Sequence, residues 1–209
     1  LQQRVGVLVV GCGGTGAAIA GGLPHLHLAL LAAGHPAGLH VRLMDGDAVS
    51  ETNCLRQPFS RSEVGLKKAV VLTTRINAWF DCGWEAVPEH LTNEHRLPHD
   101  THVVISAVDT RAARKLLAAR LAQSYVRYWL DTGNGAASGQ YVLGEPRNWT
   151  NRESPERLRT AAELYPEMLD AEADARDTQP ACSAVEALER QEPFVNQTIA
   201  AHTLALLAR

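Results

Sequence analysis

The sequence predicts a doubly wound α/β fold, with a mainly parallel sheet and helices on both of its faces. Two observations lead to this prediction. A β-branched run, a glycine-rich turn and a helical segment follow one another near the start of the chain, as R-V-G-V-L-V-V-G-C-G-G-T-G at residues 4–16. Further short apolar runs then alternate with helical segments, a pattern typical of parallel sheets built from strand–helix–strand units.

The composition limits the class of protein. The chain has 209 residues, 45% hydrophobic and 21% charged, which suits one large globular domain or a domain with an appendage. The net charge of −3 argues against a nucleic-acid surface. No apolar run is long enough to indicate a membrane span. The four cysteines form no close pair, which disfavours a zinc site and favours reduced thiols and a cytoplasmic location.

The glycine turn is the first candidate site. Gly11, Gly13 and Gly16 form G-x-G-x-x-G, with Gly14 as an additional glycine, between a predicted strand at residues 5–10 and a helix. Glycines let the backbone approach a polyphosphate, and the helix N-terminus offers unpaired N–H groups. This context predicts a nucleotide site, and the alternative is a tight turn that binds no ligand.

The next segments continue the alternation. The helical segment at residues 17–33 contains Pro24, so we expect a kink or two short helices. A second strand is predicted at residues 39–44, followed by Asp45. An acidic residue in this place binds ribose hydroxyls in dinucleotide-binding units. The distance from the glycines exceeds the usual spacing of about 20 residues, so the connecting helix carries an insertion.

A polar turn follows the second strand, as D-G-D-A-V-S-E-T-N-C-L-R-Q. Its candidate ligand-binding side chains are Asp45, Asp47, Asn53, Arg56 and Gln57. Ligands bind at the carboxyl ends of parallel strands, and arginine suits bidentate contact with phosphate. The alternative is a solvated loop that carries charges of both signs.

Four ordered motifs over residues 4–144 resemble the ThiF/MoeB/HesA superfamily of ubiquitin-activating-enzyme-like adenylyltransferases. They are G-x-G-G-x-G, D-x-D-x-V-x-x-x-N-x-x-R-Q, the G-x-x-K that ends at Lys68, and an aspartate after the fourth predicted strand. The resemblance implies a Rossmann-like adenylation domain at residues 1–144, with ATP and Mg²⁺ as cofactors, and a homodimer. It implies that Asp45 binds ribose, that Arg56 and Lys68 bind phosphates, and that Asn53 lines the same pocket. The spacing favours Lys68 over Lys67, and we expect Arg56 and Lys68 to face solvent without ATP.

The remaining elements up to residue 144 are predicted from local pattern. A helix is expected from Ser62, as N-cap, to Asn77. Strands are expected at residues 84–87, 101–107, 126–131 and 140–143, and a helix at residues 110–123. The glycine-rich segment between the last two strands suits a hairpin loop or close approach to a ligand.

Asp109 follows the predicted strand at residues 101–107, at the same edge of the sheet as the glycine turn. The resemblance implies that it supports the Mg²⁺ on ATP, an ion that takes one or two carboxylates in proteins. It also extends to Arg114. The alternative is that Asp109 only caps the following helix.

Residues 145–209 form a predicted crossover segment with C-terminal helices that pack on the same domain. Prolines and acidic residues indicate a flexible stretch up to residue 180, with one short helix at residues 155–162. Helices are expected at residues 184–191 and from near Pro193, the latter with Val195, Ile199, His202 and Leu206 on one face.

Cys182 precedes the predicted helix at residues 184–191, where a thiolate is favoured, so it is a candidate nucleophile. The alternative is a half-buried apolar residue. The surrounding C-S-x-x-E-A-L-x-x-Q-x-x-F-x-N-Q resembles the ThiF-related proteins of bacterial PRTRC cassettes, which also encode a ubiquitin-like protein. The resemblance thus suggests a ubiquitin-like or sulfur-carrier protein as partner.

Together these features predict ATP-dependent adenylation of a partner's C-terminal carboxylate, with a possible thioester step. Arg56, Lys68 and Mg²⁺ near Asp109 would offset the triphosphate charge, and Cys182 would accept the acyl group. An NAD-dependent oxidoreductase would use the glycines and Asp45 but leaves Arg56 and Lys68 unexplained. A catalytically inactive scaffold subunit of the same superfamily is the other alternative.

Overall fold

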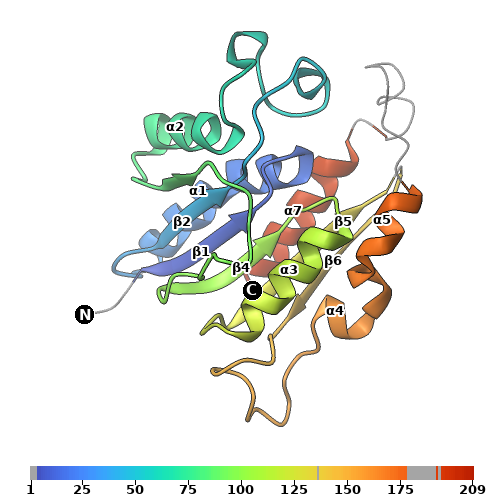
Figure 1. Ribbon diagram of the computed structural model, residues 1–209. Helices are drawn as coiled ribbons and strands as arrows, with labels where there is room; N and C mark the ends of the chain where they lie inside the picture. The colour runs from blue at the N-terminus through green and yellow to red at the C-terminus, as the bar shows by residue number, and fades with distance from the viewer. Residues whose placement is uncertain (1–3, 136, 178–191, 193) are drawn as a thin grey trace.

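The computed structural model describes residues 4–135, 137–177, 192 and 194–209, and it confirms the doubly wound α/β fold (Figure 1). In this described part, six strands form one sheet in the order β3-β2-β1-β4-β5-β6. Five strands run parallel, and β6 pairs with β5 in the antiparallel direction. The strands are β1 (Val5–Val10), β2 (Leu39–Met44), β3 (Glu85–Val87), β4 (Thr101–Ser106), β5 (Tyr128–Asn134) and β6 (Gly139–Gly144).

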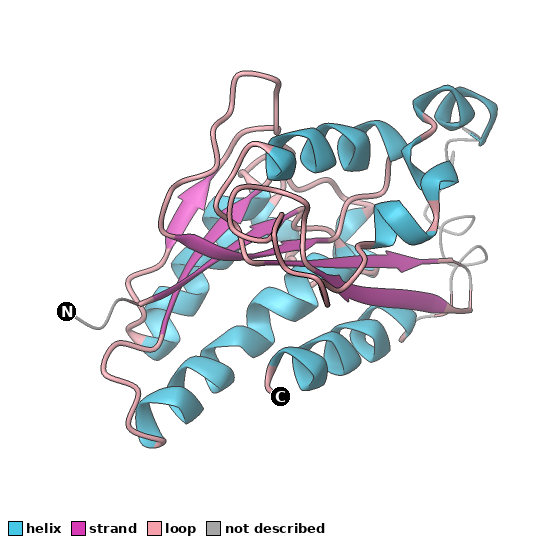
Figure 2. Ribbon diagram, turned by 90° about the horizontal axis from the view of Figure 1, so that it is seen from below, coloured by secondary structure: helices cyan, strands magenta, loops and turns pink. Residues whose placement is uncertain are grey.

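Helices cover both faces of this sheet (Figure 2). One face packs against α1 (Gly14–Ala32), α2 (Lys68–Phe80) and α7 (Val195–Leu207). The other face packs against α3 (Arg111–Ala122), on which the short elements η3 (Pro166–Leu169) and α5 (Ala171–Asp177) lie. The strand order reverses between β1 and β4, so the crevice at their carboxyl ends is where a ligand is expected in such a sheet.

Strand β1 lies at the centre of the core. Val7 and Val9 face the cluster built with α1 and α2, whereas Leu8 and Val10 face the cluster built with α3. All four side chains are buried, as the uninterrupted apolar run predicts for a strand covered on both faces. The predicted positions of β1 and β2 are confirmed.

Helix α1 continues through Pro24 as one helix, so of the two predicted alternatives, a kink or two short helices, the second is wrong. Leu23 and Pro24 are buried, and packing of this segment against the core offsets the cost of a proline inside a helix. By length and composition α1 could cross a membrane. Its buried residues belong to the core, however, and core helices of soluble proteins meet the same criterion.

Helix α2 begins at Lys68, so the prediction of a helix from Ser62 is wrong. Residues Arg61–Glu63 form a separate 3₁₀ turn, η2, which Ser60 caps. Gly65 has a φ of 90°, a left-handed conformation that stops any helix from continuing through it. Lys67 then pairs in antiparallel fashion with Ala48, which ties this segment to the polar turn after β2.

The segment after β6 also differs from the sequence prediction. Its helical elements lie at residues 161–177, as α4 (Ala161–Leu164), η3 and α5, and not at residues 155–162. The part expected to be flexible is tied by two buried amides to the residues just before β5. Asn148 Nδ2 donates to the Val126 carbonyl over 2.7 Å, and Asn151 Nδ2 donates to the Arg127 carbonyl over 2.9 Å.

In α7 the buried face is rotated from the predicted one. Val195 and Ile199 are buried as expected, but Asn196 and Thr203 accompany them. His202 is exposed and its ring stacks on Tyr141 of β6. The apolar spacing alone did not reveal that small and polar side chains occupy the contact with α1.

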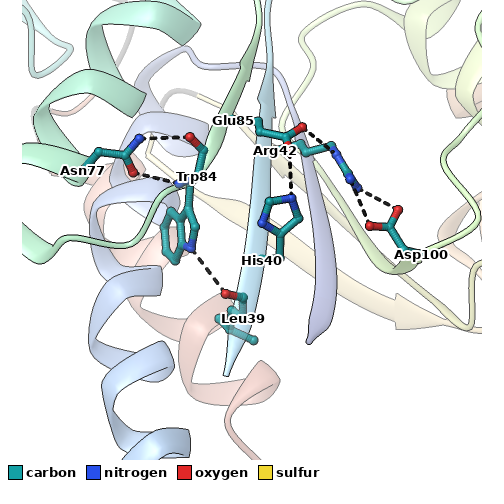
Figure 3. Close-up of polar contacts among 7 residues, drawn as sticks. All are labelled: Leu39, His40, Arg42, Asn77, Trp84, Glu85 and Asp100. Atoms are coloured by element: carbon teal, nitrogen blue, oxygen red, sulfur yellow. Dashed lines mark hydrogen bonds and ion pairs between the residues drawn. The ribbon is translucent and has the colours of Figure 1, made fainter. Parts of the chain in front are cut away.

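Short edge strand β3 is fixed by polar contacts (Figure 3). Arg42 of β2 donates to Glu85 over 3.1 Å and forms a two-point pair with Asp100 at 2.9 Å. The hydrogen bond from Arg42 holds the pKa of Asp100 below its ordinary value. Asn77 of α2 brackets the backbone of Trp84 with two hydrogen bonds of 2.9 Å. A three-residue strand is therefore anchored from both neighbouring elements.

Two glycine substitutions test the packing with opposite expected signs. A Cβ at Gly6 would overlap the Asp100 carbonyl oxygen where β1 meets β4, so Gly6→Ala should lower the free energy of unfolding by about 1–3 kcal/mol. Gly21 in α1 is exposed with no neighbour near a Cβ, so Gly21→Ala should raise it by about 0.5–1 kcal/mol. Urea unfolding of both variants measures this, and equal signs would contradict the packing described.

Candidate functional site

A cavity of about 610 Å³ opens at the carboxyl ends of β1, β2, β4 and β5. This volume lies in the range of small-molecule sites. The cavity is lined by these predicted site residues: Gly11, Gly13, Gly14, Asp45, Asp47, Arg56, Gln57, Lys68 and Asp109. The structure therefore brings together most of the side chains that four separate motifs supplied.

The glycine turn is shaped by close backbone approach. Gly11 has a φ of 94°, and a Cβ there would lie 2.5 Å from the Ala107 carbonyl oxygen. A Cβ at Gly16 would overlap the carbonyl oxygen of Gly11, so Gly16 lets α1 begin directly against the end of β1. Gly13 faces open space, with Gln57 Nε2 at 4.0 Å from a Cβ. The turn thus leaves room at the N-terminus of α1, where unpaired N–H groups attract an anion.

Asp45 braces this turn. Its Oδ2 accepts a hydrogen bond from the Cys12 N–H at 2.6 Å, and its Oδ1 accepts one from the Asp47 N–H at 2.7 Å. A carboxylate has about four lone-pair sites, so Asp45 retains acceptor capacity toward the cavity. Burial, and next the charge of Asp45, raise the pKa of the Cys12 thiol, so Cys12 is a neutral core thiol.

Lys68 is buried, with a side chain only 7% exposed, so the expectation that it faces solvent is wrong. Its Nζ pairs with Asp47 Oδ2 at 3.0 Å, and His90 Nε2 lies 3.7 Å from Asp47 Oδ1. The neighbouring Lys67 is exposed, and its Nζ donates to the Gly46 carbonyl. The structure places Lys68 at the cavity, as the G-x-x-K spacing predicted, and leaves Lys67 outside it.

Only some of the site residues predicted in the polar turn after β2 line the cavity. Arg56 and Gln57 are half-buried and line the cavity. Asn53 lies in the 3₁₀ turn η1 (Asn53–Leu55) and is absent from the cavity lining. Its Oδ1 accepts the Ser50 N–H at 2.9 Å, so Asn53 shapes the loop that carries Arg56.

Asp109 is exposed at the cavity and makes no hydrogen bond or ion pair with the described residues. The capping alternative is not observed, because the Thr110 side chain accepts the Ala113 N–H at 3.2 Å as the N-cap of α3. Asp174 of α5 accepts the next N–H groups, from Arg111 and Ala112. No cluster of three or more metal-ligating side chains occurs in the described residues. A single carboxylate suits Mg²⁺ held mainly by phosphate oxygens and water.

Several lining residues were not anticipated from the sequence. Glu89, His90 and Leu91 follow β3, Thr132 and Asn134 lie in the second half of β5, and Asn196 lies in the first turn of α7. The sequence could have indicated the residues after β3, because polar groups that follow a parallel strand lie at this edge of the sheet. Asn196 comes from a distant helix, and only the tertiary structure places it here. Cys182 lies outside the described residues.

A model of the ThiF family matches residues 2–208. The chain belongs to the ThiF family. Among solved structures, E. coli tRNA N6-threonylcarbamoyladenosine dehydratase, TcdA, is 25% identical with a TM-score of 0.50, and the match covers 63% of this chain and 53% of that one. A structure described as TcdA (CsdL) is 27% identical with a TM-score of 0.45, over 55% of this chain and 44% of that one. No curated protein matches.

This ThiF-family chain spans about half the length of the dehydratase it resembles. The mostly parallel sheet with helices on both faces agrees with that family's fold, as predicted.

Arg114, the other arginine that the resemblance covered, is buried beneath the site. Its Nε lies 3.4 Å from Asp131 Oδ1, and its Nη2 donates to the Thr132 carbonyl at 3.1 Å. Asp131 is 1% exposed and also accepts from Ser106 Oγ at 2.5 Å. Burial raises the pKa of Asp131, while Arg114 and Ser106 oppose this rise. The pair joins α3 to β5 behind the cavity.

Removing the Arg114 guanidinium tests how much the buried pair with Asp131 contributes to stability. Arg114→Met leaves Asp131 without its cation and should lower the free energy of unfolding by about 3–5 kcal/mol near neutral pH. This loss of stability should be smaller at acid pH. Because the pKa of Asp131 is raised in the folded state, protonation of Asp131 favours folding, and stability falls as the pH rises through the raised pKa. Denaturant unfolding at acid and neutral pH measures both effects.

Lys115→Met serves as the control on the same helix, because Lys115 is exposed and forms no ion pair with the described residues, so its loss should matter by at most about 1 kcal/mol. Equal losses for the two variants, or a loss that does not depend on pH, would contradict the role of the buried pair.

Proposed function

We propose that this protein binds ATP with Mg²⁺ and adenylates the C-terminal carboxylate of a partner protein. The observation that carries the proposal is the convergence of the glycine turn, Arg56, Lys68 and Asp109 on one cavity. Membership of the ThiF family supports an adenylyltransferase-type activity at the level of the family.

The chemistry accounts for these residues. An oxygen of the partner's carboxylate forms a bond to the α-phosphorus, while the bond from that phosphorus to the pyrophosphate oxygen breaks. Both reactants are anionic, so the cations Arg56 and Lys68 offset the repulsion and stabilise the transition state. No general base is required, because a carboxylate is already ionised near neutral pH. When bound near Asp109, Mg²⁺ supplies further charge neutralisation.

Lys68 has a competing anion before ATP binds. Its Nζ is paired with Asp47, whose side chain is 55% exposed. A triphosphate carries more charge than one carboxylate, so Lys68 exchanges Asp47 for phosphate as ATP enters. Asp47 is then released to solvent or toward the nearby His90.

The partner in this proposal is a ubiquitin-like or sulfur-carrier protein, and this chain acts on it as a homodimer. A sulfur nucleophile, with Cys182 as the candidate within the chain, would then attack the acyl carbon of the adenylate, forming a thioester and releasing AMP. The similar dehydratase is named for a modified nucleoside of tRNA. The net charge of −3 here does not favour RNA as the substrate.

Exchange of radiolabelled pyrophosphate into ATP tests the function directly. The assay supplies the small-protein fraction of the source organism's extract as the carboxyl donor. Exchange should need that fraction and Mg²⁺, and it should disappear after carboxypeptidase treatment of the fraction. ATP binding without exchange would indicate a scaffold subunit, and binding of NAD⁺ in preference to ATP would indicate an oxidoreductase.

The two phosphate-binding cations give the next prediction. Arg56→Ala or Lys68→Ala should lower pyrophosphate exchange at least about tenfold, which is about 1.4 kcal/mol of lost transition-state stabilisation. Stability should change by at most about 1 kcal/mol in Lys68→Ala, because the Asp47 left behind is exposed. Lys67→Ala, one residue away and outside the cavity, is the control. Near-normal exchange in both cavity variants would exclude this assignment.

Asp109 is tested through the metal. Asp109→Asn should shift the Mg²⁺ concentration for half-maximal exchange upward at least about fivefold, while AMP affinity changes by at most about twofold, since AMP binding needs little metal. Titration of Mg²⁺ in the exchange assay and calorimetry with AMP give the two values. Parallel losses of exchange and of AMP affinity would instead indicate that Asp109 shapes the cavity.

A further inference from the structure

Asn196 is a polar side chain from α7 that lies inside the cavity formed by the sheet. It is 5% exposed, yet it lines the cavity beside Gly14 and Thr15 at the first turn of α1. Its Oδ1 accepts from Thr15 Oγ1 at 2.9 Å and from Asn134 Nδ2 at 2.5 Å. One amide therefore joins three elements that are far apart in the sequence.

The contact with Asn134 orients the amide. Oδ1 faces the Asn134 Nδ2 donor and the Thr15 hydroxyl, so Nδ2 points the other way; in a flipped amide, Nδ2 would face the Nδ2 donor of Asn134. Nδ2 lies where a Cβ of Gly14 would be, which explains why the turn carries a glycine beyond its G-x-G-x-x-G pattern. Nδ2 donates to no described group of the chain, so it is available to a group inside the cavity.

The surroundings of Nδ2 favour an anion. Gly14 of α1 lies against Asn196 of α7, and Gly22 lies against Leu204, the same number of residues further along each helix. Helices α1 and α7 therefore run parallel, with their N-termini side by side. Both helix ends carry partial positive charge.

We infer that Asn196 is a nucleotide-binding residue, whose Nδ2 donates a hydrogen bond to the phosphate that sits on the N-terminus of α1. This inference rests on the proposed binding of ATP and adds α7 to the elements that hold the nucleotide.

Asn196→Asp tests the hydrogen bond with little change of shape. The new carboxylate can still accept from Thr15 and Asn134, and a negative charge beside two helix N-termini is tolerated in the folded protein. It replaces the Nδ2 donor by an anionic oxygen that repels phosphate. Calorimetry with adenosine, AMP, ADP and ATP should show at least about a tenfold loss of affinity for each phosphorylated ligand, and at most about a twofold change for adenosine.

Gln197→Glu is the matched control, since it adds the same charge to the same helix at an exposed position and should leave all four affinities within about twofold. Asn196→Ala, which removes the donor without adding charge, should weaken the phosphorylated ligands about threefold or more and decides the question if Asn196→Asp does not fold.

The outcomes separate this inference from the proposed function. If the wild-type protein binds ATP but Asn196→Asp binds it equally well, or loses adenosine affinity as much as AMP affinity, the inference is overturned and ATP binding stands. If the wild-type protein binds none of the four ligands, the proposed function itself is overturned, together with the phosphate contact.

Discussion

The close approach of α1 to the end of β1 is the constraint on which the site depends. A side chain at Gly11 would meet the Ala107 carbonyl, and one at Gly16 would meet the Gly11 carbonyl. Without these side chains, the helix begins directly beyond the strand, at the switch point between β1 and β4. Asp45 then fixes the turn from the neighbouring strand by accepting the Cys12 N–H. Three neighbouring strands thereby hold one helix N-terminus open toward a cavity.

Charge in the cavity is arranged around this helix end. Lys68 is buried but neutralised locally by Asp47, and Arg56 is carried on a loop that Asn53 shapes. Asp109 is left without a partner among the described residues because Thr110 and Asp174 cap α3 in its place. Cations are thus positioned before an anionic ligand arrives, at little cost while the site is empty. Behind the cavity, the Arg114–Asp131 pair joins α3 to β5 and keeps the wall of the site in place.

Much of this arrangement was predictable because it follows from local sequence. The apolar runs and the glycine turn indicate where β1 and β2 lie. Residues that follow parallel strands, such as Asp45 and Asp109, meet at one edge of the sheet by topology alone. The start of α2 was missed because the pairing of Lys67 with Ala48 is a tertiary contact. The burial of Lys68 follows from that pairing, and so it was missed too. Asn196 carries no local signal, since its place depends on how α7 packs along α1.

Amide hydrogen exchange, measured with and without ATP and Mg²⁺, tests most directly whether the helix N-termini hold the phosphates. The account predicts slower exchange at residues 11–17, 109–112 and 195–198 when ATP is bound, and a smaller effect from NAD⁺ at equal concentration. Protection absent from residues 11–17, or equal protection by NAD⁺, would contradict it.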